Sequence, residues 1–332
     1  MSPAAKPIAT PPPAREAVER LHATRSRAHP GGGRVADGGR PFRERKPPWL
    51  KVPAPGGPTY RRLKQAIHAD NLHTVCEEAN CPNVGECWER GTATFMILGD
   101  VCTRRCGFCN VKTGKPTWHD PLEPMRVAAQ VKRMGLRHAV VTSVDRDDLP
   151  DYGAGAFVGV IRSIRMLAPG CKVEVLTPDF RGQEMPLAKV VHERPDVFNH
   201  NVETVPRLYP KARRGSDFMR SARVLRLAKE MGGDQVVTKS GLMVGLGESF
   251  EEMVDALGRL REKQVQVITI GQYLRPTEQH LPVVRYWHPE EFAALERVAY
   301  ELGFESVAAG PLVRSSYHAD ESARAVAERR AA

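Results

Sequence analysis

Residues 99–111 read GDVCTRRCGFCNV and place three cysteines, Cys102, Cys106 and Cys109, within eight positions. An apolar, β-rich run at 92–101 leads into them, so the cysteines leave the C-terminal end of a predicted strand. A closed metal site takes four ligands, and three thiols leave one position open. The spacing therefore predicts a metal or cluster site with one vacant position near the end of this strand.

Five further strand-like runs alternate with helix-length segments downstream, at 138–144, 172–178, 197–205, 236–246 and 265–274. Apolar positions recur at i, i+3, i+4 and i+7 in 157–164 and 250–257, and Ser249 with Glu252 suits a capping box. A last helix is predicted at 289–304. Such repeats predict an α/β fold with a parallel sheet, either open or closed into a barrel. In both cases ligands gather at the C-terminal ends of the strands.

The composition is that of a soluble globular protein, with 41% hydrophobic and 27% charged residues among 332. No run approaches the roughly 18 apolar residues that a membrane span needs. Residues 1–51 hold eleven Lys or Arg against four Asp or Glu, which leaves 38 against 35 for the rest. The net charge of +10 is thus concentrated in this segment, which disfavours nucleic-acid binding by the folded part. Residues 1–45, rich in Pro, Gly and Arg, are predicted to form a disordered leader on a cytoplasmic protein.

Six of the seven cysteines fall within residues 76–109, and a second triad lies upstream of the first: Cys76, Cys81 and Cys87. Disulfides fit a large cytosolic protein poorly, so metal binding or catalysis is the expected use. Zinc stays an alternative, although the first triad contains a single C-x2-C pair. Iron–sulfur clusters suit the thiols better, because two cubanes need eight thiolates and Cys171 is expected to be a buried apolar residue. At least one cluster would then have an iron that no cysteine binds.

The first triad has Phe108 before its last cysteine and stands at the start of repeated β/α units, and it resembles the radical S-adenosylmethionine superfamily. The resemblance implies a partial (β/α)6 TIM-like barrel and a [4Fe-4S] cluster whose open iron binds S-adenosylmethionine. One electron from the cluster then cleaves this cofactor to a 5′-deoxyadenosyl radical. Gly241, Met243, Gly245 and Glu248 fit the superfamily pattern G-x-I-x-G-x-x-E, with Met for Ile, and would contact adenine. A tight strand-to-helix turn is the alternative for these glycines.

The resemblance also assigns cofactor contacts to polar residues at the strand ends. Asn201 and Glu203 would suit the ribose or the sulfonium, and Lys239 and Arg275 are candidates to anchor the methionine carboxylate or the substrate. The expected cofactor-binding residues are Phe108, Thr142, Ser143, Asn201, Glu203, Lys239, Gly241, Met243, Gly245 and Arg275.

More specifically, the chain resembles the lipoyl synthase family from residue 46 to residue 318. The motifs are CEEANCPNVGECW with CTRRCGFC, TSVDRDDLPDYGA, FNHNVETV, QYLRPT, HLPVVRYW and GPLVRSSYHA. The resemblance assigns an auxiliary [4Fe-4S] cluster, the sulfur source, to the second triad, with Ser316 as a further ligand and Ser315 as the alternative. The implied domains are a leader at 1–45, an extension with the auxiliary cysteines at 46–91, the barrel at 92–304, and a C-terminal segment with the serine ligand at 305–332.

The reaction implied by the family is radical insertion of sulfur at C6 and C8 of an octanoyl group on a carrier-protein lysine, with two S-adenosylmethionine molecules per turnover. The implied partners are octanoylated domains of 2-oxoacid dehydrogenase E2 subunits and of the glycine cleavage H protein, and an electron donor of ferredoxin or flavodoxin type. A monomer is expected, with no nucleic acid and no membrane as partner.

Several alternatives stay open. Arg104 and Arg105 would either offset the charge of the cluster or face solvent or a reductant. Another sulfur-inserting enzyme, of biotin synthase or methylthiotransferase type, would share the first triad, although the close spacing of the two triads disfavours the methylthiotransferases. A non-catalytic iron–sulfur or zinc module is the alternative outside enzymes.

Overall fold

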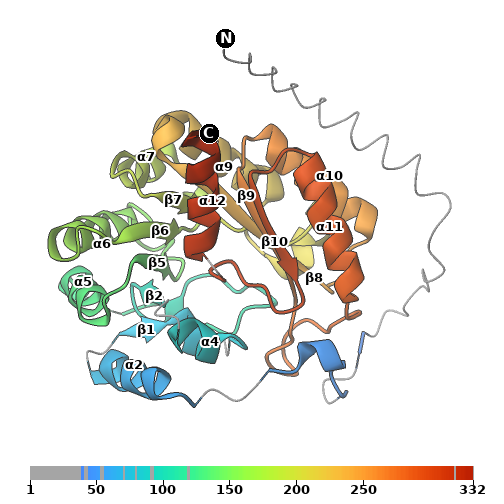
Figure 1. The fold of residues 1–332 in the computed structure, drawn as a ribbon, viewed down its shortest axis with the longest axis horizontal. Coiled ribbons are helices and arrows are strands. Elements are labelled where there is room, and N and C mark those ends of the chain that lie inside the picture. Colours follow the sequence, from blue (N-terminus) through green and yellow to red (C-terminus); the bar gives the residue numbers. More distant parts are fainter. Residues whose placement is uncertain are drawn as a thin grey trace, which may run out of the picture.

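The computed structural model describes residues 39–40, 44–52, 56–69, 72–78, 81–89, 93–117, 120–317 and 319–331, so most of the predicted leader at 1–45 lies outside it. The main sheet in these ranges has eight strands (Figure 1), and their order across the sheet is β1 (His73–Thr74), β2 (Thr94–Ile97), β5 (His138–Ser143), β6 (Lys172–Leu176), β7 (Val197–Asn199), β8 (Val237–Val244), β9 (Val267–Gln272) and β10 (Ser306–Gly310). Neighbouring strands are parallel except β1 and β2. The strands follow one another across the sheet in chain order without a reversal, so the α/β sheet forms a partial barrel, as the family resemblance implies.

Helices connect the parallel strands and stand around the outside of the sheet (Figure 1). The α-helices described are α2 (Pro58–Ala69), α3 (Val75–Glu78), α4 (Val84–Glu89), α5 (Glu123–Met134), α6 (Ala154–Leu167), α7 (Glu184–His192), α8 (Tyr209–Ala212), α9 (Phe218–Gly232), α10 (Phe250–Glu262), α11 (Pro289–Glu301) and α12 (Ala319–Ala331). The predicted capping box of α10 is confirmed, because the side chains of Ser249 and Glu252 each accept the other residue's backbone N–H. No helix in the described ranges has both the length and the apolar character needed to cross a bilayer.

The interior of the barrel is mostly apolar but contains one buried charged cluster. β2 and β9 are buried along their whole length, as expected for parallel strands covered on both faces. Glu174 of β6 lies 3.0 Å from the ammonium of Lys239 on β8, and Asn199 Nδ2 donates to the same carboxylate at 3.0 Å. His138 Nε2 is 3.4 Å from it. These polar contacts join β5, β6, β7 and β8 inside the barrel.

α12 packs against the N-terminal end of the barrel. Its Val326 forms a buried cluster with Val197, Val237 and Val267, which are the first residues of β7, β8 and β9. This contact covers the end of the barrel opposite to the C-terminal ends of the strands. The open mouth therefore lies where the first cysteine triad leaves β2.

The six predicted strands are all present, but the first ends at Ile97 rather than near 101, and β1 was not predicted. Two larger differences concern β7 and β10. β7 ends at Asn199 rather than near 205, because Glu203 has a φ of 69° and joins the sheet through a single bridge to Leu242. β10, which pairs with β9, was not predicted. Its sequence, SVAAG, is short and has small side chains, so it gives a weak strand signal. The sheet thus continues into the segment predicted at 305–332.

Candidate active site with two cysteine-lined cavities

The loop that carries the first triad is closed by a short parallel ladder. β3 (Val101–Cys102) pairs with β4 (Lys112–Thr113) and brings the two ends of the loop together. Within it, the Cys109 N–H donates to the carbonyl of Cys106 at 3.1 Å. Cys102, Cys106 and Cys109 all line one cavity of about 240 Å³ at the mouth of the barrel, which we call the first cavity.

The C-terminal ends of β5, β6 and β7 supply much of the remaining wall of the first cavity. The predicted residues that line it are Phe108, Thr142, Ser143, Asn201 and Glu203. Ser143 Oγ, Thr177 Oγ1 and Asn201 Oδ1 are buried at this wall, and none has a hydrogen-bond partner among the described residues. Buried polar atoms are normally paired, so these three atoms indicate a polar ligand in the first cavity.

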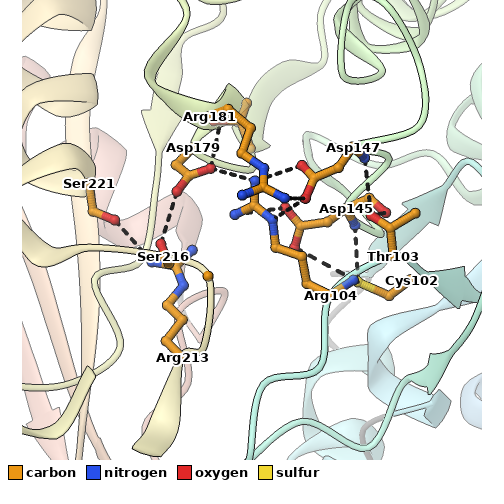
Figure 2. Close-up of polar contacts among 12 residues, drawn as sticks. Cys102, Thr103, Arg104, Asp145, Asp147, Asp179, Arg181, Arg213, Ser216 and Ser221 are labelled. Carbon is orange, nitrogen blue, oxygen red and sulfur yellow. Dashed lines mark hydrogen bonds and ion pairs between the residues drawn. The ribbon is translucent and has the colours of Figure 1, made fainter. Parts of the chain in front are cut away.

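A buried arginine fixes the triad loop to the strand ends (Figure 2). Arg104 donates from Nε and Nη2 to Asp147 at 2.8 and 2.7 Å, and its Nη2 lies 2.8 Å from Asp179. Asp145 is a third carboxylate, 3.4 Å from Nη1. Burial alone would raise the pKa of Asp179, but hydrogen bonding to Arg104 holds that pKa well below its ordinary value. Arg104 therefore serves as the cationic centre of three carboxylates that follow β5 and β6.

Arg213 is a second buried cation and lines the first cavity. Its Nη1 donates to Asn201 O at 2.8 Å and to Ser221 Oγ at 3.1 Å. Burial, with Arg213 nearby, lowers the pKa of His200 to about 3, so this imidazole is neutral. Since its Nδ1 lies 2.8 Å from Thr177 O and must donate there, its Nε2 is left to accept from Arg213 at 3.4 Å. The guanidinium is thus held at the cavity by neutral acceptors.

The second cavity, of about 140 Å³, contains most of the predicted auxiliary site. Its lining includes Cys76, Cys81, Ser315 and Ser316 of that site. Gly241 and Met243, which were predicted to contact the adenine of the cofactor, also line this second cavity and not the first. Cys87 lies on α4, where its N–H donates to Asn83 O at 2.9 Å, and is not among the residues that line either cavity. The structure therefore brings two of the three auxiliary cysteines together with both candidate serines.

Four residues line both cavities, and we call them the shared wall: Val75, Asn201, Glu203 and Ser315. Glu203 is the strained member, since a φ of 69° is uncommon for a residue other than glycine. Its N–H donates to Gly241 O at 3.0 Å, and its carbonyl accepts from the Met243 N–H at 2.8 Å. These bonds to β8 hold the strained backbone where the cavities meet, a placement typical of functional sites.

The segment that carries Ser316 lies across the end of β9. An added Cβ at Gly271 would stand 2.0 Å from the carbonyl oxygen of Val313, so only glycine allows this close approach. From the other side, Asn83 Nδ2 donates to Leu312 O at 2.6 Å. The two contacts fix the C-terminal segment between β9 and the auxiliary cysteines. This segment directly follows β10, whose pairing with β9 places it there.

Each cavity places a cation beside its cysteine thiols. Burial raises the pKa of Cys76 to about 11 and that of Cys106 to about 12, and Arg213 opposes the rise at Cys106. Burial also raises the pKa of Cys81, where Arg314 opposes it. Burial lowers the pKa of Arg314 itself, while the charge of Cys81 favours its protonated form. A nearby cation or a bound metal stabilises the thiolate form of a cysteine at these positions.

Three predicted cofactor residues do not line either cavity. The ammonium of Lys239 is engaged by Glu174 inside the barrel, which explains its absence from the site. Arg275 donates to His280 O at 2.9 Å and closes a surface loop. Gly245 has a φ of 106° in the turn after β8, which fits the alternative of a tight turn.

Sequence reasoning missed Arg213 and Thr177 as cavity residues. Arg213 has an identical neighbour, Arg214, and only the fold shows that the first is buried and the second exposed. The same holds for the pair left open in the triad loop, where Arg104 is buried and Arg105 exposed. A pair of adjacent arginines gives no periodic signal that separates them.

Comparisons with known proteins give the family. The model of the radical SAM superfamily matches residues 96–260, and that of the N-terminal domain of lipoyl synthase matches residues 15–81. The lipoyl synthase of Rubrobacter xylanophilus is 58% identical over 286 residues, which cover 85% of this chain and 89% of the relative. The chain belongs to the lipoyl synthase family. The lipoyl synthase of Laribacter hongkongensis is 52% identical, with 86% of this chain and 90% of the relative covered.

Solved structures confirm the fold of this family member. Methylornithine synthase has a TM-score of 0.50 at 15% identity, with 71% of this chain and 80% of that chain covered. HydG, a maturase of the [FeFe]-hydrogenase, has a TM-score of 0.51 at 16% identity, with 65% and 56% covered. Both likenesses concern the fold alone. The radical SAM family of the chain implies one [4Fe-4S] cluster and S-adenosylmethionine.

The residues of the first cavity fit these two groups. The cavity combines three thiols, a guanidinium and three unpartnered polar atoms, which together suit an iron–sulfur cluster and a polar, charged cofactor. Among the described residues, no three His, Cys, Asp or Glu side chains converge closely enough to hold a single metal ion. A cubane spans four irons, so its ligands stand further apart than those of one ion.

Proposed function

We propose that the protein inserts two sulfur atoms, at C6 and C8, into an octanoyl group carried on a protein lysine, with the cluster of the second triad as the sulfur donor. The observation that carries the proposal is the shared wall: two cavities, each lined by cysteines of one triad, meet at four common residues. An alkyl chain placed along this wall reaches both cavities. A radical generated in one is then adjacent to a sulfur source in the other.

Two [4Fe-4S] clusters and S-adenosylmethionine, used twice per turnover, would supply the radical and the sulfur. Cys102, Cys106 and Cys109 would hold the first cluster. The second triad, with Ser316, would hold the other. A serine oxygen is a hard ligand beside soft thiolates, so its bond to iron is the easiest one to exchange. The support for this second site is its lining, which brings Cys76, Cys81 and Ser316 together.

Polar residues of the first cavity would orient the cofactor. Arg213 presents a fixed guanidinium that suits a carboxylate, the role that the sequence analysis gave to Lys239 or Arg275. Ser143, Thr177 and Asn201 offer the unpartnered oxygen atoms for hydrogen bonds to ribose or amine groups. Such fixed contacts lower the entropic cost of placing the reacting atoms.

Apolar residues around the shared wall suit the octanoyl chain. Val75 lines both cavities, Met96, Val144 and Leu176 line the first, and Met243 lines the second. Burying a methylene group contributes about 0.8 kcal/mol, so such a lining both binds the chain and excludes water. An unactivated C–H bond offers no proton that an acid or a base can usefully transfer. The protein therefore contributes by positioning the octanoyl chain and excluding water rather than by acid–base catalysis.

The partners follow from this chemistry. The enzyme acts on a protein-bound octanoyl group and needs a reductant. We infer that its substrates are octanoylated domains of 2-oxoacid dehydrogenase E2 subunits and of the glycine cleavage H protein, and that it works as a cytoplasmic monomer. A small donor of ferredoxin or flavodoxin type would supply the electrons.

An anaerobic incubation tests the function. The reconstituted protein, S-adenosylmethionine, a chemical reductant and an octanoyl-lysine peptide are combined, and the peptide mass is followed. Metal analysis should give about eight irons per chain when both clusters are present. The expected product carries two sulfur atoms. A fully loaded protein that yields no sulfur-bearing peptide would refute the proposal.

A further inference from the structure

The outer side of the first triad loop faces a groove that the proposed function does not use. The groove has a volume of about 260 Å³ and is lined by residues from four separate segments: Gly39, Arg207, Leu208, Lys211, Ala212, Leu246, Gly247, Leu281, Pro282 and Val284. The Gly107 N–H donates to Ala212 O at 2.9 Å, and Gly107 O accepts from the Leu281 N–H at 2.9 Å. The triad loop is therefore bonded directly to two walls of the groove.

Only thin backbone separates this groove from the first cavity. Ala212 lines the groove, and the next residue, Arg213, lines the cavity. Likewise, Cys106 and Phe108 line the cavity on either side of Gly107. An added Cβ at Gly107 would stand 2.9 Å from the Leu281 side chain and 3.1 Å from the backbone oxygen of Lys211. The absence of a side chain at this position thus keeps the wall thin.

The two segments that meet at the groove, the triad loop and the stretch through Ala212, carry positive charge without acidic partners. Arg105 is the exposed residue between the first two cysteines, and Lys211 and Arg214 are exposed on the adjoining segment. In the described part of the chain, none of the three has an ion-pair partner. Arg207, in contrast, is bound to Glu252. We call Arg105, Lys211 and Arg214 the basic rim.

We propose that the groove with its basic rim is the docking site of the electron donor, and that this donor is a small one-electron carrier protein with an acidic face. The inference rests on the proposed function, because that function consumes one electron for each S-adenosylmethionine cleaved. In each encounter the donor loses one electron and the cluster on the first triad gains it, with no bond made or broken between the proteins. Transient redox complexes use small interfaces and gain their rate from opposite charges.

The location favours a redox donor over the octanoylated carrier domain. An electron can cross a thin wall of backbone, whereas a lysine-borne acyl chain needs an open path to the shared wall. Such a path leads through the mouth of the barrel rather than through the bonded segments at Gly107 and Ala212. The octanoylated carrier domain is therefore the alternative occupant that the experiment must separate.

The test reverses two charges of the rim and leaves the triad loop unchanged. Lys211→Glu with Arg214→Glu should slow reduction of the cluster by reduced flavodoxin about tenfold or more at low salt, and should flatten its dependence on ionic strength. Reduction by the cationic reductant methyl viologen should not slow. Lys132→Glu, an exposed site on α5, is the matched control and should keep the parent rate with flavodoxin.

Two further readouts separate the outcomes. Titration of oxidised flavodoxin onto the cluster-free chain should show weaker binding to the double variant than to the parent. An unchanged flavodoxin rate in the double variant overturns the proposal, and so does a variant that loses octanoylated carrier binding instead. If the parent makes no sulfur-bearing product even with methyl viologen, the proposed function fails, whatever the docking result.

Discussion

Arg104 Nη2 lies 2.8 Å from Oδ1 of Asp179, and this contact joins the loop of the first cysteine triad to the end of β6. The same guanidinium also binds Asp147 and faces Asp145, so one side chain links three strand-end carboxylates to the loop. These contacts use side chains of the chain alone and include none of the three cysteines. We therefore expect them to hold the loop of the triad at the mouth of the barrel whether or not a cluster is bound.

Arg104→Ala should destabilise the cluster-free chain by about 3–5 kcal/mol, because it removes the buried cation from three carboxylates, two of which keep only the more exposed Arg181 and Arg220. Arg105→Ala is the matched control, since Arg105 is exposed, and it should change stability by no more than about 0.5 kcal/mol. Urea unfolding of the two variants measures the difference. Equal stability of the two would contradict a structural role for the Arg104 contacts.

Gly271→Ala should displace the segment that carries Ser316, because its Cβ would meet the carbonyl oxygen of Val313. We expect a loss of about 1–3 kcal/mol from this overpacking and a strong loss of sulfur insertion, with S-adenosylmethionine cleavage retained. Gly170→Ala is the control, because an added Cβ at Gly170 has open space. Sulfur insertion at the parent rate in Gly271→Ala would show that the close approach is dispensable.

Substitutions in the two triads should affect different activities. Cys102→Ala removes a ligand from the first cavity and should abolish both deoxyadenosine formation and sulfur insertion. Cys76→Ala alters the second cavity alone and should keep deoxyadenosine formation but give no thiolated peptide. Chromatography of deoxyadenosine and mass spectrometry of the peptide read the two activities. Loss of both activities in Cys76→Ala would count against separate roles.

The two serines can be compared in the same way. Ser316 lines the second cavity alone, whereas Ser315 lines both. We expect Ser316→Ala to change the Mössbauer signature of the second cluster and to lower sulfur insertion about tenfold or more, a typical effect of losing a contact at a metal site. Ser315→Ala should keep the signature. The reverse pattern would assign the ligand to Ser315.

The buried cluster around Glu174 gives a pH prediction. Burial would raise the pKa of Glu174, but Lys239 and His138 lower it to about 2 from the ordinary value of 4.5. Because the folded pKa is the lower one, the ionised carboxylate stabilises the fold above about pH 4.5, and this contribution is lost as the pH falls toward 2. Glu174→Gln should therefore show a weaker dependence of the urea midpoint on pH between 5 and 3. An identical dependence in both chains would argue against the ion pair.

Much of the fold followed from local patterns in the sequence. The strands β2, β5, β6, β8 and β9 are apolar runs whose character does not depend on their neighbours, and α10 is marked by its own cap. β10 escaped prediction because its five residues are small and it becomes a strand only by pairing with β9. The packing of α12 also depends on a contact distant in sequence, because Val326 packs against the first residues of three strands.

The site was predictable where chemistry depends on residue type and spacing. Five of the six triad cysteines, and the strand-end residues Asn201 and Glu203, were singled out in this way and line the cavities, whereas Cys87 does not. The arginines were not predictable, because their role depends on which of two neighbours turns inward. Lys239 was predicted at a strand end, but it lies near the start of β8, where the carboxylate of Glu174, two strands away, binds it. Arg213 was missed because the sequence does not distinguish it from its exposed neighbour Arg214.

Isotope labelling of the cluster sulfide, compared between the parent and Cys76→Ala, tests the central claim most directly. The protein is reconstituted with heavy-isotope sulfide, freed of excess sulfide, and allowed one turnover with the octanoyl-lysine peptide under anaerobic conditions. If the second cavity is the sulfur source across the shared wall, both sulfur atoms of the product carry the heavy isotope. A product whose sulfur is unlabelled, or labelled to the same extent in Cys76→Ala, would contradict the account.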